Sequence, residues 1–230
     1  GGNCSVSGNI LDDPAGLGIS MTAAGGSIYS NAVYSANNEG IKVHSGSASC
    51  TVAGNIVWES VSEGIHSAGN YTTVSLNVVY ATEHNGIYSS GSGSSVVGNA
   101  LYDPANGSAE YGITSVGPST SIVANSLYYD STPDGAAAIY QRGRLSTVSL
   151  NSIFRAPTTG IHLTSTATEC VVSGNSVQAS SQNGIINEAR QATSIVGNIV
   201  MGSRANGVRV APADYSNINL NIIAANGQNA

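Results

Sequence analysis

The chain has 230 residues, which is within the range of a single domain. Only 9% of them are charged, the net charge is −6 and no basic run is present, so nucleic acid is not an expected partner. No apolar run approaches the roughly 20 residues that a membrane-spanning helix needs. Val and Ile recur at regular intervals, which argues against a disordered, low-complexity chain.

One Asn recurs at intervals of 22 to 26 residues along the chain. The series is Asn9, Asn31, Asn55, Asn77, Asn99, Asn125, Asn151, Asn175, Asn198 and Asn221. A β-branched residue stands three positions before each of them, and an aliphatic residue stands two positions after. This pattern predicts a short strand on each side of a turn that contains the Asn.

A second anchor follows nine residues after most of these Asn residues and is usually Gly-Ile, as in Gly40-Ile41 and Gly64-Ile65. The position two beyond the Ile is often aliphatic, which predicts a third strand with the Ile facing inward. One repeat cannot bury its own apolar side, so the repeats should stack as coils at about 4.8 Å per coil. The recurring Asn is expected to form an internal ladder of amides.

The unit in "VAGNIVWESVSEGIHS" and "VVSGNSVQASSQNGIIN" resembles the parallel β-helix repeat of the pectate-lyase-like superfamily. The resemblance covers residues 1–230 and implies one all-β domain, a right-handed single-stranded parallel β-helix of about ten coils of 22–26 residues. Its members include pectin and alginate lyases, epimerases and bacteriophage tailspikes, which implies an extracellular, secreted or virion-associated protein. The calcium-binding patterns of this superfamily are absent, so neither a metal nor another cofactor is expected. We expect the chain to be a segment of a longer protein.

The three cysteines, Cys4, Cys50 and Cys170, each stand five residues before a ladder Asn. Two coils separate Cys4 from Cys50, about 9.6 Å by strand spacing, which exceeds the roughly 7 Å that a disulfide spans. They are expected to be small buried residues. Reactive or metal-binding thiols are the alternative, which no Cys or His spacing supports.

The distance from the ladder Asn to the second anchor is 13 residues in two adjacent repeats. The insertions fall in residues 101–113 and 127–140, and stacking predicts that the two loops lie side by side and form a wall. Their carboxyl and phenol groups belong to Asp103, Glu110, Tyr111, Tyr129, Asp130 and Asp134. The candidate catalytic residues are Glu110, Asp130 and Asp134, together with His84, which should stack against Glu110.

Two outward rows are expected beside this wall. The aromatic row stands three residues after the ladder Asn and comprises Tyr34, Trp58, Tyr80, Tyr102, Tyr128 and Phe154. It is either a packing stripe or a stacking track for sugar rings. The second row follows the anchor Ile and includes Lys42, His66, Tyr88, Tyr140 and His162, with Arg142 close behind. From the two rows, the candidate substrate-binding residues are Lys42, Trp58, His66, Tyr88, Tyr102, Tyr128, Tyr140, Arg142 and His162.

Glu39 and Glu63 precede the anchor Gly on adjacent repeats. Two carboxylates in close contact would raise the pKa of one of them. The alternative, which we favour from the sequence, is that both are solvated.

Two functions fit these features. The first is an enzyme that binds and cleaves a polysaccharide along the outside of the rod. Glu110 with Asp130 or Asp134 could hydrolyse the glycan, whereas the Lys, His, Tyr and Arg side chains could support elimination next to a uronate. The second is a non-catalytic shaft, adhesin or receptor-binding segment, whose outer rows would be oligomer contacts, with a homotrimer as the expected assembly.

Overall fold

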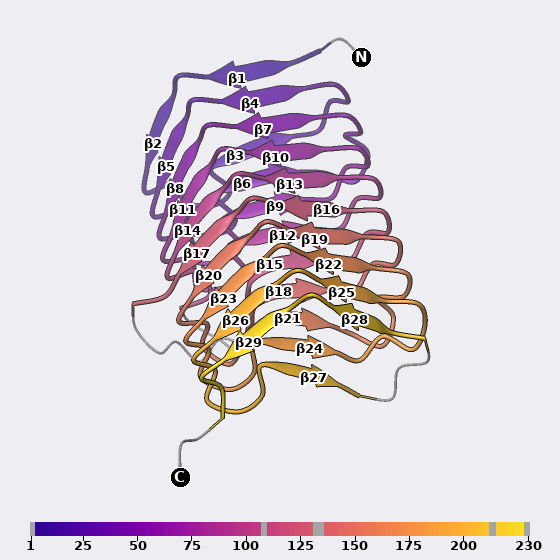
Figure 1. Cartoon of the computed structure of the whole chain (residues 1–230). Helices are drawn as coiled ribbons and strands as arrows, with labels where there is room; N and C mark the ends of the chain where they lie inside the picture. Colours follow the sequence, from indigo (N-terminus) through magenta and orange to yellow (C-terminus); the bar gives the residue numbers. More distant parts are fainter. Residues whose placement is uncertain (1–2, 107–109, 131–135, 212–214, 228–230) are drawn as a thin grey trace.

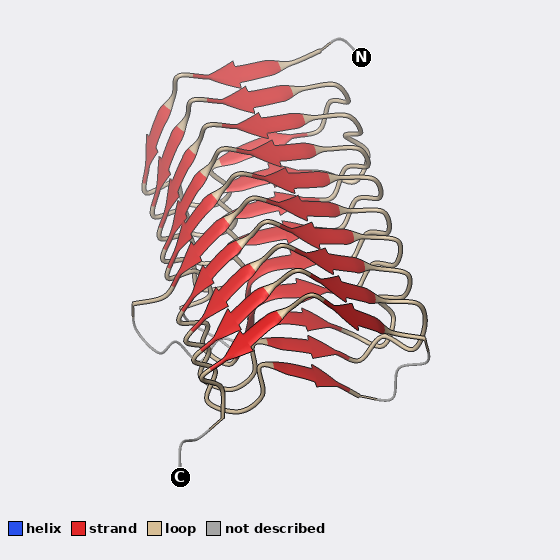
Figure 2. Ribbon diagram, in the orientation of Figure 1, coloured by secondary structure: helices blue, strands red, loops and turns tan. Residues whose placement is uncertain are grey.

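The protein is an all-β parallel solenoid, seen in a computed structural model whose described residues are 3–106, 110–130, 136–211 and 215–227. The chain winds as a rod from one terminus to the other, and its three sheets form the sides of the rod (Figure 1). In Figure 2 the described residues of this path are drawn as strands and loops. None of the described residues forms a helix that is long and apolar enough to cross a membrane.

Sheet A contains the strands that precede each ladder Asn. Its ten strands are β1 (Ser5–Ser7), β4 (Ser27–Tyr29), β7 (Thr51–Ala53), β10 (Thr73–Ser75), β13 (Ser95–Val97), β16 (Ser121–Val123), β19 (Thr147–Ser149), β22 (Val171–Ser173), β25 (Ser194–Val196) and β28 (Asn217–Asn219).

Sheet B contains the strands that follow each ladder Asn. Its ten strands are β2 (Ile10–Asp12), β5 (Ala32–Tyr34), β8 (Ile56–Trp58), β11 (Val78–Tyr80), β14 (Ala100–Tyr102), β17 (Ser126–Tyr128), β20 (Ser152–Phe154), β23 (Ser176–Gln178), β26 (Ile199–Met201) and β29 (Ile222–Ala224).

Sheet C contains the strands of the second anchor. Its nine strands are β3 (Ile19–Met21), β6 (Ile41–Val43), β9 (Ile65–Ser67), β12 (Ile87–Ser89), β15 (Tyr111–Ser115), β18 (Ala137–Gln141), β21 (Thr159–Leu163), β24 (Ile185–Asn187) and β27 (Val208–Val210). The predicted ten coils are therefore nine complete coils, followed by a turn of which the described residues supply strands of sheets A and B only.

Each strand pairs in parallel with its equivalent one coil away, in the register that the repeat predicts. Val74 lies opposite Val52 and Val96 in sheet A, and Val79 lies opposite Val57 and Leu101 in sheet B. The central residue of most strands in sheets A and B is buried, because alternate side chains of a strand point to opposite faces. These inward rows and the anchor isoleucines fill the interior of the rod.

The Asn ladder is confirmed. The side-chain amide of Asn99 donates to Asn125 Oδ1 at 2.9 Å and to the carbonyl of Val74 at 3.0 Å. The backbone N–H of Asn99 donates to the same Asn125 Oδ1. Because each amide is bonded to the next coil and to a strand carbonyl, the buried ladder keeps its polar groups satisfied.

The cysteine prediction is confirmed at two positions and wrong at the third. Cys50 and Cys170 are buried free thiols, whereas Cys4 is exposed. The thiol of Cys50 donates to the carbonyl of Ala23 on the preceding coil. Cys4 lies in the first described coil, and among the described residues no preceding coil supplies a carbonyl as Ala23 does for Cys50.

Candidate functional site

The side chains predicted to form the site lie on two different sheets. Lys42, His66, Tyr88, Tyr140 and His162 are the outward residues of consecutive or nearby strands of sheet C. The aromatic row projects from sheet B, which forms another side of the rod. The structure therefore does not bring all the predicted substrate-binding residues together.

The two long loops lie side by side, as the stacking of coils predicts. The backbone N–H of Asp130 donates to Asp103 Oδ1 at 2.6 Å, and the N–H of Ala136 donates to the carbonyl of Glu110 at 2.9 Å. Asp134 lies outside the described residues. The loops follow sheet B and lead into sheet C, so they stand at the corner between the two outer faces.

Tyr129 was predicted in this wall, and that prediction is wrong. Its side chain is fully buried, and burial raises the pKa of its hydroxyl. Glu59 and Asp103, which occupy the same position after sheet B in other coils, have positive φ angles of 55° and 44°. Tyr129 is not among the positive-φ residues, so the in–out alternation of β17 continues and turns its ring inward. The phenol group lies beneath Gly112, at a position that a side chain at residue 112 would occupy.

The two described carboxylates predicted to act as a hydrolytic pair have different partners. Glu110 Oε1 lies 3.8 Å from His84 Nδ1, as the predicted stacking of these two residues requires. Asp130 Oδ1 lies 3.5 Å from Arg155 Nη1 and accepts a hydrogen bond from the hydroxyl of Tyr128. Each carboxylate is thus held beside a cationic or ionisable nitrogen rather than facing the other.

A first cluster of ionisable groups lies on coils two to four of sheet C. Glu39 Oε1 bonds to the ammonium group of Lys42 and lies 3.3 Å from His66 Nδ1. One ligand atom each of Glu39, Glu63 and His66 fits within 4.8 Å of the others. The ring of Tyr88 meets His66 edge to face at 5.0 Å.

Glu39 is not solvated, contrary to the alternative that the sequence favoured. The residue is 4% exposed, and its Oε2 is buried without a hydrogen-bond partner among the described residues. Burial by itself raises the pKa of this carboxyl, but the hydrogen bond from Lys42, a backbone hydrogen bond, the charge of Lys42 and the hydrogen bond from His66 together outweigh burial and hold the pKa below its ordinary value. Glu39 is therefore an ionised, internally paired carboxylate. The cluster offers oxygen and nitrogen ligands, but the Lys42 ammonium already neutralises the buried carboxylate.

A second cluster lies on coils five to eight, next to the long loops. The rings of Tyr111 and Tyr140 stack at 4.0 Å with an angle of 9° between their planes, and Tyr140 meets His162 edge to face at 5.2 Å. His162 Nε2 lies 3.1 Å from Glu188 Oε2. Burial, followed by the neighbouring Tyr140, raises the pKa of Tyr111 to about 12. Arg142 follows β18 and is exposed beside this cluster.

Sequence reasoning did not identify Glu188. It is the first residue after β24 and stands two positions beyond the outward-facing Ile186, so the same alternation predicts that it points outward. The second cluster combines a carboxylate, an imidazole, two phenols and a guanidinium. These are the residue types that transfer protons and stabilise negative charge.

The aromatic row is confirmed as an outward row of sheet B, but its rings face one another. Trp58 and Tyr80 stack at 4.0 Å, and Tyr128 and Phe154 stack at 5.6 Å. Partners in these pairs are one coil apart, so the stacked faces are turned along the rod and ring edges are turned to solvent. A shallow apolar hollow of about 500 Å³ lies over this sheet, lined by Tyr34, Ile56, Trp58, Val78, Tyr80 and Tyr102.

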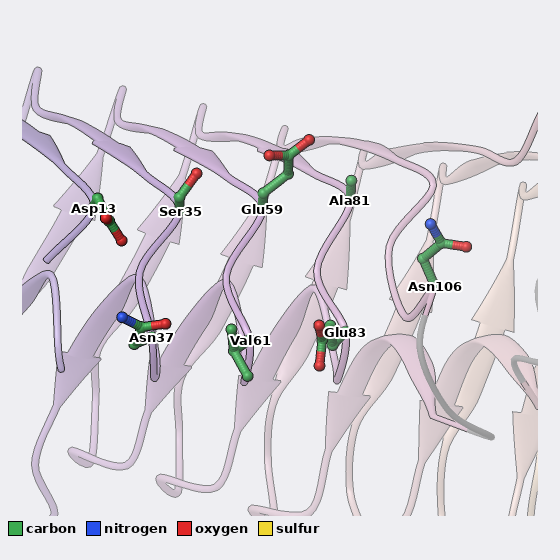
Figure 3. Close-up of a pocket in the computed structure, with 8 residues that line it drawn as sticks. All are labelled: Asp13, Ser35, Asn37, Glu59, Val61, Ala81, Glu83 and Asn106. Atoms are coloured by element: carbon green, nitrogen blue, oxygen red, sulfur yellow. The ribbon is translucent and has the colours of Figure 1, made fainter. Parts of the chain in front are cut away.

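A groove of about 480 Å³ runs along the corner between sheets B and C (Figure 3). Asp13, Ser35, Glu59 and Ala81 form one row along it and Asn37, Val61 and Glu83 form a second, with Asn106 on the first long loop at one end. No Lys or Arg is among the described residues that line this groove.

Comparison with known proteins agrees with this architecture. The chain matches the family model of a right-handed β-helix region over residues 1–128 and 63–230. No curated protein sequence matches it.

Solved structures of several enzymes and tailspikes are similar to the chain. The Dettilon tailspike protein has a TM-score of 0.70 and 14% identity, with 95% of this chain and 53% of that chain covered. The catalytic unit of an α-1,3-glucanase from Streptomyces thermodiastaticus has a TM-score of 0.75 and 16% identity, with 97% and 48% covered. A pectate lyase has a TM-score of 0.67 and 11% identity, with 92% and 70% covered. The chain spans about half the length of the first two, and at these identities the likeness shows the fold alone.

Proposed function

The chain belongs to the right-handed β-helix family, and we propose that it binds and cleaves a carbohydrate polymer along the outer face of sheet C. The fold is shared with an α-1,3-glucanase and a pectate lyase, whose names refer to carbohydrate polymers. Its likeness to tailspike proteins supports a location outside the cell or on a virion.

The observation that carries the proposal is the concentration of ionisable groups on this face. The four His residues and the single Lys of the chain all lie on sheet C strands or in the turns beside them. They are His44, His66, His84, His162 and Lys42. The stacking of the coils does not require the His and Lys side chains to lie on one sheet, because the strands of sheets A and B stack in the same way without any His or Lys.

The second cluster is the better candidate for the catalytic centre. It stands beside the two long loops, and it combines groups that can give and accept protons with an exposed guanidinium. In an elimination next to a uronate, a base removes the proton at C5 and an acid protonates the leaving oxygen, while a cation neutralises the carboxylate. Tyr140 and His162 supply the first two types of group, and Arg142 supplies the cation. Because Glu110 and Asp130 have separate partners, the described residues support elimination better than hydrolysis by that pair.

The experiment is incubation of the chain with a panel of bacterial and algal polysaccharides. New reducing ends together with the ultraviolet absorbance of unsaturated uronates are expected. Tyr140→Phe should lower kcat by roughly 10²- to 10⁴-fold, since it removes the hydroxyl and keeps the ring that stacks on Tyr111. Tyr29→Phe, on the exposed face of sheet A, is the matched control and should leave the rate unchanged. Reducing ends without the absorbance would indicate a hydrolase and would overturn the eliminative mechanism.

The second candidate function is a non-catalytic shaft, adhesin or receptor-binding segment. One observation favours it: four of the six rings of the aromatic row stack in two pairs, so one face of each of these rings is not free to stack on sugars. No product from any polymer in a broad panel would make this the better description.

A further inference from the structure

Charge changes sign along the corner between sheets B and C. In the first coils, Asp13, Glu59 and Glu83 line the groove of Figure 3. Further along the same corner, Arg155 and Arg204 line a smaller hollow of about 190 Å³, together with Asp130. One end of the corner is therefore acidic and the other end is mainly basic.

Several of these charges have no partner inside the described part of the chain. Asp13 and Glu59 are exposed and form no ion pair there, and Arg204 is exposed and likewise unpaired. Arg155 has only a long contact with Asp130, in which both side chains are at least half exposed. Exposed contacts of this kind contribute little to stability, so the side chains of Asp13, Glu59, Arg155 and Arg204 are available to another molecule.

Sheet B, which borders this corner, is a face with one charged side chain in its described strands. Each of its strands turns two side chains outward, and Asp12 is the only charged residue among them. Large apolar side chains stay exposed on it, including Ile56 at 42%, Val78 at 38% and Tyr102 at 44%. A contiguous exposed apolar face bordered by charges is typical of a protein–protein interface.

We infer that sheet B and its corner bind a second copy of this chain in an antiparallel arrangement about a two-fold axis. A two-fold rotation about the strand direction reverses the rod and keeps the corner at the same edge, so the acidic coils of one copy meet the basic coils of the other. Asp13 and Glu59 are two coils apart, and so are Arg155 and Arg204. One register therefore pairs Asp13 with the partner's Arg204 and Glu59 with the partner's Arg155, twice per dimer.

A parallel arrangement, two-fold or three-fold, fits the charges less well. In parallel rods packed through sheet B, the symmetry axis runs along the rod and reverses the strand direction, so the corner of one copy lies against the opposite edge of the next copy. That edge is the turn with the ladder Asn, which carries no charged residue, so the charges of the corner meet no complementary charge there. The antiparallel dimer is therefore preferred over the homotrimer expected from the sequence.

The interface area supports a role for the corner. Ten strands of three residues cover a face of roughly 48 by 10 Å, or about 480 Å². A stable interface buries about 800 Å² on each partner. A dimer through the strands alone would fall short of this area, so the proposed dimer includes the charged corner in its contact.

The test is sedimentation equilibrium of the whole chain at low and high salt. A dimer that weakens with added salt is expected. Asp13→Arg and Arg204→Asp should each weaken the dimer by about tenfold, and the chain that carries both changes should regain its affinity. Arg155 occupies the position equivalent to Asp13 on another coil, directly after a sheet B strand, and has a φ of 60°. The backbone at residue 13 should therefore accept an Arg side chain. Glu169→Arg, on the turn between sheets C and A, is the control and should leave the dimer unchanged.

Three results would overturn the inference. One is a monomer at every concentration, and another is a trimer. The third is a dimer that the two single charge reversals weaken but their combination does not restore. Circular dichroism of each variant verifies that the β-helix is intact, which is expected because both side chains are exposed.

Discussion

His162 Nε2 lies 3.1 Å from Glu188 Oε2, although 26 residues separate the two along the chain. The pairing of β21 with β24 places them on adjacent coils of sheet C. Both side chains are partly exposed, at 23% for His162 and 39% for Glu188. The carboxylate can therefore hold the imidazole in one orientation while the ring stays open to a bound polymer.

Under the proposed function, Glu188 is a positioning residue for His162. Glu188→Ala should lower kcat by roughly tenfold to a hundredfold, because an imidazole that is not held loses its alignment with the substrate. Glu188→Gln keeps an oxygen that can accept the imidazole N–H, so it should recover part of the loss. The measurement is kcat and KM for both variants, with urea unfolding as the control for stability. Equal losses in the Ala and Gln variants would contradict this positioning role.

Hydrolysis through the carboxylates of the long loops predicts that Glu110→Gln abolishes cleavage, whereas the proposed elimination predicts that cleavage persists, and in both cases the β-helix should stay intact. The residue lies in a loop outside the Asn ladder, and its contact with His84 at 3.8 Å is long, so the fold does not depend on it. Cleavage of the polymer that the panel identifies is the readout, and Glu169→Gln on the turn between sheets C and A is the matched control. Unchanged activity in the Glu110 variant would remove this residue from the candidate catalytic groups.

The sequence predicts the fold well because every coil repeats the same physical requirement. A polar residue at a ladder position such as Asn99 has to meet its equivalent one coil away, and a buried residue such as Val74 has to lie over Val52. These requirements fix the strand register, and the structure confirms it. Identical units stacked in one direction leave little freedom for another topology.

The candidate site is less predictable because it depends on departures from the repeat. The inward turn of Tyr129 results from the backbone conformation of one residue, which the spacing of ladder residues does not specify. The burial of Glu39 depends on its ion pair with Lys42, three positions later in the same coil. The repeat places Glu39 and Lys42 in different rows of equivalent positions, so it does not predict their contact. Sequence periodicity therefore does not predict contacts within one coil, nor contacts between non-equivalent positions of neighbouring coils.

Ionised Glu39 should make the stability of the protein depend on pH in the acid range. Its folded-state pKa is lowered, so its contribution is fully present above the unfolded value of about 4.3 and is lost as pH falls through the folded value. Glu39→Gln cannot make this contribution. The difference in free energy of unfolding between the native chain and the variant should therefore shrink on acidification. Urea unfolding at a series of pH values measures it, and a difference that is constant with pH would contradict the expectation.

Gly112→Ala should destabilise the rod, because a Cβ at this position would lie 2.7 Å from the carbonyl oxygen of Ala138 and would also meet the Tyr129 hydroxyl. Contacts under 3.0 Å require backbone or core movement, and overpacking of this kind typically costs about 1–3 kcal/mol. Gly46→Ala is the matched control, since a Cβ there meets nothing within 4 Å. Adding Tyr129→Phe to the Gly112 variant should recover part of the loss, because it removes the hydroxyl and leaves the clash with Ala138. Urea unfolding of the four proteins measures each step. Equal stability of the Gly112 and Gly46 variants would mean that the coils move apart at little cost and that residue 112 does not have to be glycine.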